Sequence, residues 1–319
     1  MSIQGSILNF FLKKFVKNTK GSPENYSYKD MRELMNENFE LGNKNFIEKK
    51  IKKAIFSNKL SNINSNEIFL DNLRTIKITR DDCHQDKCIL YFHGGGYVAG
   101  SPETHVGFLK QLYKYAKITI FAIDYSLAPE KKYPNALHDA ITSYNSIKEL
   151  GYNEDQIIIG GDSAGGNLSL ACVLKLQEQN QNLPSKLFLL SPWTDLTASG
   201  KSIKFNSKKD PYLSYDDYNL TKKSMKRVVE EWYAPDQNIE NKYISPLFAD
   251  YKLFPKTLIQ VSDIEILLSD SIDLEKKLRE SGNEVCLSIY KNMPHVWQIF
   301  GFLPETKQAI IEIGNFLNN

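Results

Sequence analysis

Several features that mark specialised classes of protein are scarce in this sequence. Four cysteines in 319 residues are too few for a small scaffold held by disulfides. The 40 basic and 38 acidic residues nearly cancel, to a net charge of +2, which argues against nucleic acid as a partner. No stretch reaches the roughly 20 apolar residues of a membrane-spanning helix. These exclusions leave the class of globular proteins. The 41% of hydrophobic residues are ample for a buried core.

The few cysteines do not suggest metal or disulfide chemistry. Cys83 and Cys88 lack a common zinc spacing and a second ligand pair, so we expect no metal site. Cys88, Cys172 and Cys286 lie in apolar stretches, where buried free thiols are the ordinary interpretation. We therefore expect no structural disulfide and a reducing compartment, the cytoplasm.

The N-terminal segment Ser6–Lys17 is apolar and basic, but it is not a good signal peptide. Early charge is missing, and Lys13 and Lys14 interrupt the apolar run. Its apolar residues fall on one helical face: Ile7, Leu8, Phe11, Leu12 and Phe15. Such a helix can touch a membrane surface or cover an active site. We favour the cover, and we expect no stable membrane insertion.

Short apolar segments alternate with helical ones from about Thr75 onward. The expected strands are Thr75–Thr79, Lys87–Phe92, Ile118–Ile123, Gln156–Gly160, Lys186–Leu190, Thr257–Val261 and Val285–Tyr290. The expected helices are Glu103–Tyr115, Asn135–Leu150, Gly165–Gln179, Ser269–Ser281 and Glu305–Leu317. This alternation predicts an α/β fold with a mainly parallel sheet flanked by helices.

The alternation is interrupted once, which suggests how the chain is divided. Residues 1–55 are helical and charged, and residues 56–196 form the first part of the core. Residues 197–250, with a helix over Tyr215–Tyr233, form an insertion suited to a lid. Residues 251–319 complete the core.

A serine lies where a strand ends and a helix begins. The apolar run Ile157–Gly160 leads into Gly161-Asp-Ser-Ala-Gly-Gly166. In this pattern a serine nucleophile occupies a strained turn, and a Cβ on either flanking glycine would collide with a neighbouring element. The pattern predicts Ser163 as the nucleophile, with the amides of the following helix directed at developing negative charge.

A second apolar strand is followed by three glycines, in His93-Gly-Gly-Gly-Tyr97. Successive residues without side chains let backbone N–H groups turn toward one point, as an oxyanion hole requires. We expect donors at Gly95, Gly96 and Ala164, with Gly94 shaping the loop.

His295 follows the expected strand Val285–Tyr290 and is the best candidate for the base that activates a serine. The other histidines have plainer explanations: a solvated loop for His84, helix surface or packing for His105 and His138, and support of the glycine loop for His93.

An acid that orients the histidine is expected after the strand Thr257–Val261, which gives the chain order Ser, Asp/Glu, His. Three carboxylates compete there: Asp263, Glu265 and Asp270. Asp270 looks like part of a helix N-terminal cap, which makes it the weaker candidate. Asp263 and Glu265 remain open on the residues alone.

With these motifs in place, the chain resembles the hormone-sensitive-lipase family of α/β hydrolases, and most of all its small bacterial-type esterases or lactonases. The matching motifs are His93-Gly-Gly-Gly-Tyr97, Asp124-Tyr-Ser-Leu-Ala-Pro-Glu130, Tyr133-Pro134, Gly161-Asp-Ser-Ala-Gly-Gly166, Ser191-Pro-Trp193, Ser245-Pro-Leu247 and Met293-Pro-His295. The resemblance implies an α/β-hydrolase fold and a cap formed by residues 1–55 and 197–250. Ser126 departs from the arginine that is common in the family, and we expect this to loosen that corner without removing chemistry.

The resemblance also implies roles for particular residues. Ser163 is then the nucleophile and His295 the base. The family's acid lies two residues before a leucine, here Leu267, and about 30 residues before the histidine, which selects Glu265. Asp263 stays an alternative because the family more often has Asp at this point.

We therefore expect a serine hydrolase that cleaves short- to medium-chain carboxylic esters or lactones through an acyl-enzyme, without metal or cofactor. Two alternatives are a non-catalytic small-ligand binder on the same fold and an interfacial lipase; the presence of His295 with Glu265 argues against the first. A homodimer is left open. Aromatic residues that could line a pocket are Tyr97, Trp193, Phe205, Tyr212, Trp232 and Trp297.

Overall fold

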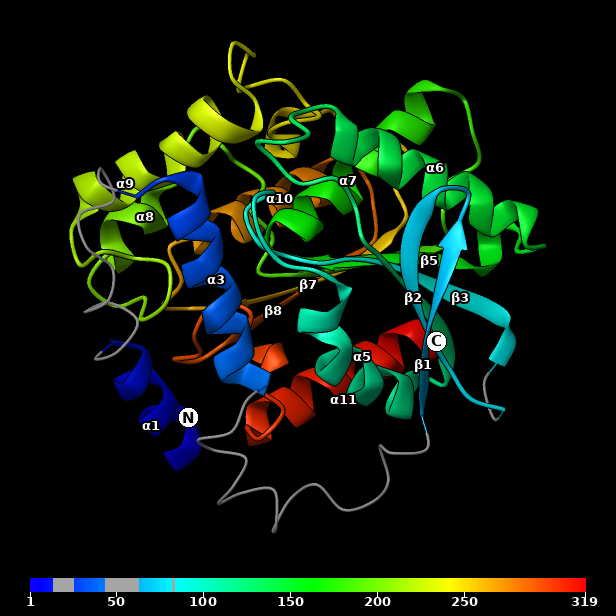
Figure 1. The fold of residues 1–319 in the computed structure, drawn as a ribbon, viewed down its shortest axis with the longest axis horizontal. Helices are drawn as coiled ribbons and strands as arrows, with labels where there is room; N and C mark the ends of the chain where they lie inside the picture. Colours follow the sequence, from blue (N-terminus) through cyan, green and yellow to red (C-terminus); the bar gives the residue numbers. More distant parts are fainter. Residues whose placement is uncertain (14–25, 44–62, 82–83) are drawn as a thin grey trace.

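The structure is a computed structural model that describes residues 1–13, 26–43, 63–81 and 84–319. Its centre is an eight-stranded sheet with the order β1-β2-β4-β3-β5-β6-β7-β8 (Figure 1). The strands are β1 (Asn64–Leu70), β2 (Leu73–Thr79), β3 (His84–Phe92), β4 (Ile118–Ile123), β5 (Ile157–Asp162), β6 (Lys186–Leu190), β7 (Lys256–Ser262) and β8 (Val285–Tyr290). β2 pairs antiparallel with β1 and β4, and every other pairing is parallel. The expected mainly parallel sheet is confirmed.

The hairpin of β1 and β2 contains an element that the sequence did not predict. Most residues of β1 are polar and exposed, so the strand lacks the apolar alternation by which strands are recognised. It pairs along its whole length with β2. Asp71, with φ of 53°, closes the turn between the two strands, and aspartate tolerates this left-handed conformation better than most residues.

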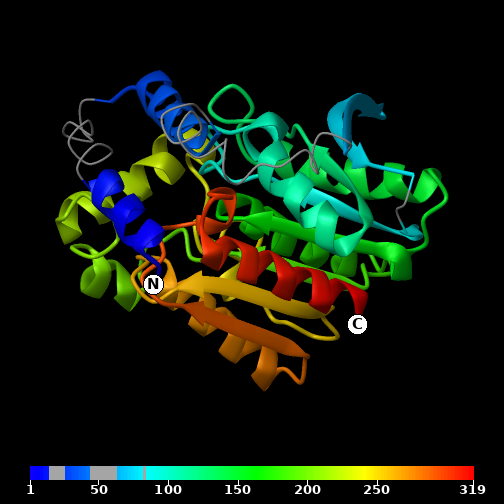
Figure 2. The same ribbon diagram turned by 90° about the horizontal axis from the view of Figure 1, so that it is seen from below.

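Helices cover both faces of the sheet (Figures 1 and 2). They are α5 (Pro102–Ala116), α6 (Asn135–Glu149), α7 (Ala164–Glu178), α10 (Leu268–Glu280) and α11 (Pro304–Asn318). Successive side chains of a strand point to opposite faces. In β3, Leu90 therefore packs in the core with α6, α7 and α10, whereas Tyr91 packs in the core with α5 and α11. The five helices begin and end within one residue of the predicted bounds.

The insertion at residues 197–250 contains α8 (Lys201–Asn206), α9 (Tyr218–Arg227) and a π-helical turn, Val228–Tyr233. The predicted helix over Tyr215–Tyr233 begins three residues late. Asp217 is the reason, because its side chain accepts the N–H of Leu220 at 2.9 Å and caps the first turn.

Two helices are described in the N-terminal segment, α1 (Ile3–Phe11) and α3 (Tyr28–Asn43). Leu8 and Leu12 are buried in the same core cluster as Met293, so the predicted apolar face is partly used for packing. Ile7, by contrast, is exposed, and Phe15 lies outside the described residues. Within the described ranges, no helix is both long and apolar enough to cross a bilayer.

The thiols are free where the structure describes them, but they are not all buried. Cys88 and Cys172 are buried, as expected, whereas Cys286 is exposed. The expectation for Cys286 is wrong because it lies in β8, an edge strand with a neighbour on one side only. Cys83 lies outside the described residues.

Candidate active site

Ser163 lies on the tight turn between β5 and α7. Its backbone angles, φ 52° and ψ −119°, belong to a region that residues with side chains rarely adopt. A Cβ on Gly161 would lie 2.3 Å from the carbonyl oxygen of Gly165, and a Cβ on Gly165 would lie 2.0 Å from that of Phe92. The predicted collisions are confirmed. The turn presents Ser163 at the N-terminus of α7, where it lines a pocket.

Glu265 and His295 form a hydrogen-bonded pair on the loops after β7 and β8. Glu265 Oε2 lies 2.6 Å from His295 Nδ1, and both side chains are buried. The other carboxylate oxygen, Oε1, accepts the N–H of Ser262 at 2.7 Å and the hydroxyl of Ser191 at 2.9 Å. Burial raises the pKa of Glu265, while the hydrogen bond and charge of His295 act in the opposite direction. The carboxylate therefore holds the imidazole through Nδ1 and leaves Nε2 for a reacting group.

The two competing carboxylates have other partners. Asp263 accepts the backbone N–H of Asn292 at 2.6 Å, so it braces the histidine loop without contacting the imidazole. Asp270 is buried inside the first turn of α10, and it accepts the N–H groups of Thr194 and Asp195, each at 2.8 Å. The expectation that Asp270 belongs to a helix cap is wrong, because its carboxylate serves a neighbouring loop.

Ser191 links the loop of Glu265 to the loop of His295. In the sequence it stood out only as part of a family motif, with no role of its own. Its hydroxyl donates to Glu265 and lies 3.4 Å from the backbone nitrogen of Val296, the residue after His295. Ser191 also has φ of 45°. The left-handed backbone places this hydroxyl between the two loops.

The glycine loop after β3 has the backbone of an anion-binding loop. Gly95 and Gly96 have φ of 127° and 61°, and a Cβ on Gly95 would lie 2.0 Å from a backbone oxygen. The N–H of Gly94 donates to Asp162 Oδ1 at 2.9 Å, so Gly94 shapes the loop, as predicted. No described residue accepts a hydrogen bond from the N–H groups of Gly95, Gly96 or Ala164. These three donors remain available to a ligand.

Comparisons with known proteins show which family the chain is similar to. A family model described as an alpha/beta hydrolase fold matches residues 89–299. An esterase of Acinetobacter venetianus is 35% identical over 229 residues, which are 72% of this chain and 73% of that esterase. The solved structure of a hormone-sensitive lipase from a metagenome library is 32% identical and has a TM-score of 0.83, covering 99% of this chain and 97% of that one.

The chain belongs to the hormone-sensitive-lipase family of α/β hydrolases. An acetyl-hydrolase of Streptomyces hygroscopicus is also similar, with 31% identity over 72% of this chain and 75% of that protein. A solved esterase of the bacterial branch of the family has 30% identity and a TM-score of 0.84, covering 99% of this chain and 98% of that one. The similarity to solved family members therefore extends over nearly the whole chain.

The pocket of this family member is mainly apolar and is lined by segments far apart in the sequence. α3 contributes Met31, Leu34 and Met35, and α9 contributes Thr221, Ser224 and Met225. Trp193 and Tyr212 also line it. No charged side chain is among its lining residues in the described part of the chain. The pocket therefore suits an uncharged, apolar group beside Ser163.

The other aromatic candidates lie elsewhere. Tyr97 is buried and stacks on Tyr233 with ring centroids 3.8 Å apart. Trp232 and Trp297 are buried without lining the pocket, and Phe205 is 69% exposed. No described residue of α1 lines the pocket, so the structure does not support the expectation that this helix covers the active site; the N-terminal residues that line it belong to α3.

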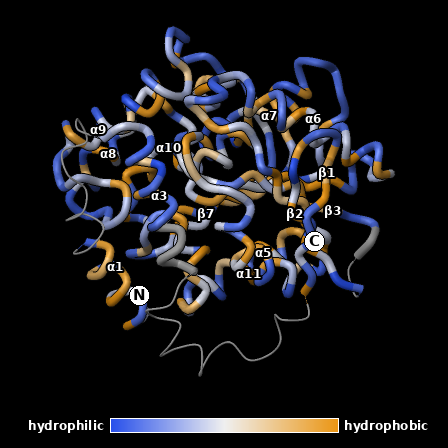
Figure 3. The backbone as a smooth tube through the Cα atoms, in the orientation of Figure 1, coloured by the Kyte–Doolittle hydropathy of each residue, from blue (hydrophilic) through white to orange (hydrophobic). Residues whose placement is uncertain are grey.

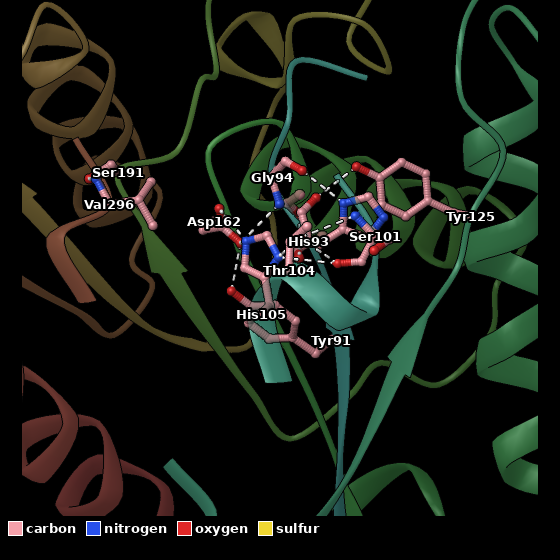
Figure 4. Close-up of polar contacts among 12 residues, drawn as sticks. Tyr91, His93, Gly94, Ser101, Thr104, His105, Tyr125, Asp162, Ser191 and Val296 are labelled. Carbon is pink, nitrogen blue, oxygen red and sulfur yellow. Dashed lines mark hydrogen bonds and ion pairs between the residues drawn. The ribbon is translucent and has the colours of Figure 1, made fainter. Parts of the chain in front are cut away.

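A buried polar network lies behind the glycine loop (Figure 4). Asp162, the residue before Ser163, accepts the Tyr91 hydroxyl at 2.6 Å as well as the N–H of Gly94, and it lies 3.3 Å from His105 Nε2. Burial alone would raise the pKa of Asp162, but the charge and hydrogen bond of His105, with the Tyr91 hydroxyl, lower it. An ionised carboxylate thus ties the serine turn to the glycine loop.

The histidines other than His295 differ in where they lie in this family member. His105 is fully buried and pairs with the Asp162 carboxylate, so it belongs to this polar network and is not a surface residue. His93 braces the glycine loop: its ring stacks on Tyr125, and its Nδ1 lies 2.8 Å from the carbonyl oxygen of Gly94. Burial, followed by the charge of His105, lowers the pKa of His93 to about 4, so its ring is neutral near pH 7. His138 is exposed on α6, and His84 begins β3.

No metal site is apparent in the described ranges. No three side chains of His, Cys, Asp or Glu are grouped there in a way that could hold a metal ion.

Proposed function

We propose that this protein is a serine carboxylesterase, which hydrolyses short- to medium-chain esters or lactones through an acyl-enzyme. The observation that carries the proposal is the 2.6 Å hydrogen bond between Glu265 and His295, on loops that leave the same edge of the sheet as the strained turn of Ser163. β5, β6, β7 and β8 are neighbours and run in parallel, so the three loops leave the same edge of the sheet. Relatives named esterase and acetyl-hydrolase support the reaction class.

In the proposed reaction, His295 Nε2 takes the proton of Ser163 as its oxygen attacks the ester carbonyl carbon. The carbonyl π electrons move to oxygen and form a tetrahedral oxyanion. Protonated His295 then gives its proton to the leaving alcohol as the C–O bond breaks. His295 then takes a proton from water, whose oxygen attacks the acyl carbon and forms a second tetrahedral oxyanion. As this collapses, the bond between the acyl carbon and the Ser163 oxygen breaks, His295 returns the proton to Ser163, and the acid is released. Glu265 keeps the imidazole in the required tautomer and stabilises its positive charge.

The oxyanion would be held by the N–H groups of Gly95, Gly96 and Ala164. One such donor typically lowers the barrier by about 3 kcal/mol. The benefit depends on donors that are already in place, because moving the loop during the reaction would cost energy. Asp162 would keep the glycine loop in place, because its carboxylate accepts the N–H of Gly94, the first glycine of the loop.

Replacing Asp162 with asparagine is therefore expected to lower kcat about tenfold or more while KM changes little. The physical reason is that the amide carries no charge to hold His105 and bonds the N–H of Gly94 less strongly. Steady-state hydrolysis of p-nitrophenyl butyrate measures both constants. Tyr91→Phe is the matched control, because it removes another hydrogen bond to the same oxygen and leaves the charge; we expect kcat within about threefold of the wild type. Equal effects of the two variants on kcat would contradict this role.

We propose that residues 1–55 and 197–250 form the cap over this site, because α3 and α9 both line the pocket. An apolar pocket of limited size favours acyl chains that fit within it over long chains presented by an oil droplet. We expect kcat/KM for p-nitrophenyl butyrate or octanoate to exceed that for p-nitrophenyl palmitate by about tenfold or more. The reason is that a longer acyl chain outgrows the pocket and collides with the cap. A series of p-nitrophenyl esters measures this.

The same series separates the proposal from its alternatives. A preference for emulsified palmitate would indicate an interfacial lipase. Failure to hydrolyse any ester or lactone would favour a non-catalytic ligand binder.

The free thiols of Cys88 and Cys172 support the further proposal that the protein works in a reducing compartment, the cytoplasm.

A further inference from the structure

The first helix, α1, exposes an apolar face that no part of the proposed reaction uses. Ile3, Ile7 and Phe10 are 78%, 51% and 62% exposed. Their spacing of four and then three residues places them on one side of a helix. Five of the twelve large apolar side chains exposed among the described residues occur in the first eleven positions. Such a concentration marks an interaction surface, because single exposed apolar residues are normal but clusters are not.

The opposite face of α1 is attached to the core, so the exposure is not that of a detached helix. Gly5, Leu8 and Leu12 are buried. The Asn9 side chain donates to the carbonyl oxygen of Asn292 at 2.8 Å. Ser2 donates through its N–H and its hydroxyl to Glu305. In Figure 3 the helix lies at the periphery of the molecule, with apolar colouring along much of its length.

The N-terminal segment that contains this helix carries charge of one sign. The first 23 residues of the sequence contain four lysines and no acidic residue, although the two signs nearly balance over the whole chain. Lys13, directly after the helix, is exposed. An anionic partner with an apolar layer beneath its charges would satisfy both features. A second copy of α1 would instead bring the same lysines together.

We propose that α1 docks the protein on the headgroup layer of an anionic lipid bilayer. Ile3, Ile7 and Phe10 enter the boundary between headgroups and acyl chains, and Lys13 stays at the phosphate level. A helix of nine residues is too short to cross the bilayer, so the contact is peripheral and reversible. The inference does not depend on the proposed esterase activity, because binding is measured without turnover.

Sedimentation of the full-length protein with lipid vesicles tests the proposal. Vesicles of phosphatidylcholine mixed with phosphatidylglycerol are expected to carry the wild type down, and pure phosphatidylcholine to carry much less. The double variant Ile7→Ser, Phe10→Ser is expected to lower the partition coefficient about tenfold or more. Lys13→Glu is expected to weaken binding severalfold to the anionic vesicles only. Added salt should weaken the wild type in the same way.

Phe205→Ser is the matched control, since Phe205 is similarly exposed, at 69%, on α8. We expect it to bind as the wild type does. Circular dichroism and the melting temperature show whether each variant is folded. Absence of wild-type binding to anionic vesicles, or equal binding by the folded double variant, would overturn the proposal. So would a dimer in light scattering that the double variant abolishes without any change in vesicle binding, because α1 would then contact a second copy.

Discussion

Ser163→Ala is expected to lower kcat/KM for p-nitrophenyl butyrate by about 10,000-fold or more. The loss follows because no other group in the proposed mechanism can form the acyl-enzyme. The turn should survive, since alanine has the same Cβ and Ser163 is held by backbone bonds, such as its N–H to the carbonyl oxygen of Leu190 at 2.9 Å. Steady-state kinetics of the purified variant, with its melting temperature, measure the effect.

Ser224→Ala provides the matched control for this variant. Ser224 lines the same pocket, but it lies on α9. In the proposed mechanism the pair of His295 and Glu265 activates Ser163 and not Ser224. We expect its kcat/KM to remain within about threefold of the wild type, since only a neutral hydroxyl contact changes. Substantial turnover by a folded Ser163→Ala protein would remove Ser163 from the mechanism.

Glu265→Gln has the second largest expected effect, a fall in kcat of about 1,000-fold or more near neutral pH. The glutamine amide can occupy the same space, but it cannot stabilise the imidazolium, and its NH₂ group can favour the tautomer that protonates Nε2. A protonated Nε2 cannot take the proton of Ser163. The measurement is kcat for p-nitrophenyl butyrate over a range of pH.

Asp263→Asn tests the choice between the two neighbouring carboxylates. Asp263 contacts the backbone of Asn292 and not the imidazole, so its loss should change kcat far less than the loss of Glu265. We expect less than about tenfold, from loosening of the histidine loop. The reverse order of effects would make Asp263 the acid and contradict the assignment of Glu265.

The strands and helices of the core could be predicted from the sequence because their local patterns and tertiary packing agree. β4, β6 and β8 have the predicted bounds, since each is a short apolar run bounded by polar or turn residues. β1 could not be predicted in this way. Its stability comes from pairing with β2, and its polar, exposed sequence carries little of that information.

The candidate site was partly predictable for a similar reason. Ser163 and the glycine loop are local backbone features, so their sequence motifs describe their shape. The acid was not decided locally, because Asp263, Glu265 and Asp270 lie on one stretch of chain. The hydrogen bond that His295 donates to Glu265 depends on how two loops from different strands meet. The links made by Ser191 and Asp162 likewise span distant segments and could be identified only in three dimensions.

The N-terminal segment shows what an amphipathic pattern leaves undecided. The sequence placed Leu8 and Leu12 on one face together with Ile7 and Phe11. In the structure Leu8 and Leu12 are buried and Ile7 is exposed, because the core covers only part of the apolar arc. The sequence pattern therefore shows that the helix has an apolar face, but not how much of that face the core covers.

The central claim is that a single serine is the activated nucleophile, and peptide mass spectrometry after treatment with a fluorophosphonate tests it most directly. The reagent bonds covalently to a serine whose proton is taken by a neighbouring base and whose oxyanion site holds the phosphoryl oxygen. The account predicts one adduct per chain, on the peptide that contains Ser163, with labelling strongly slowed in the Glu265→Gln protein. No adduct, or an adduct on another residue, would contradict it.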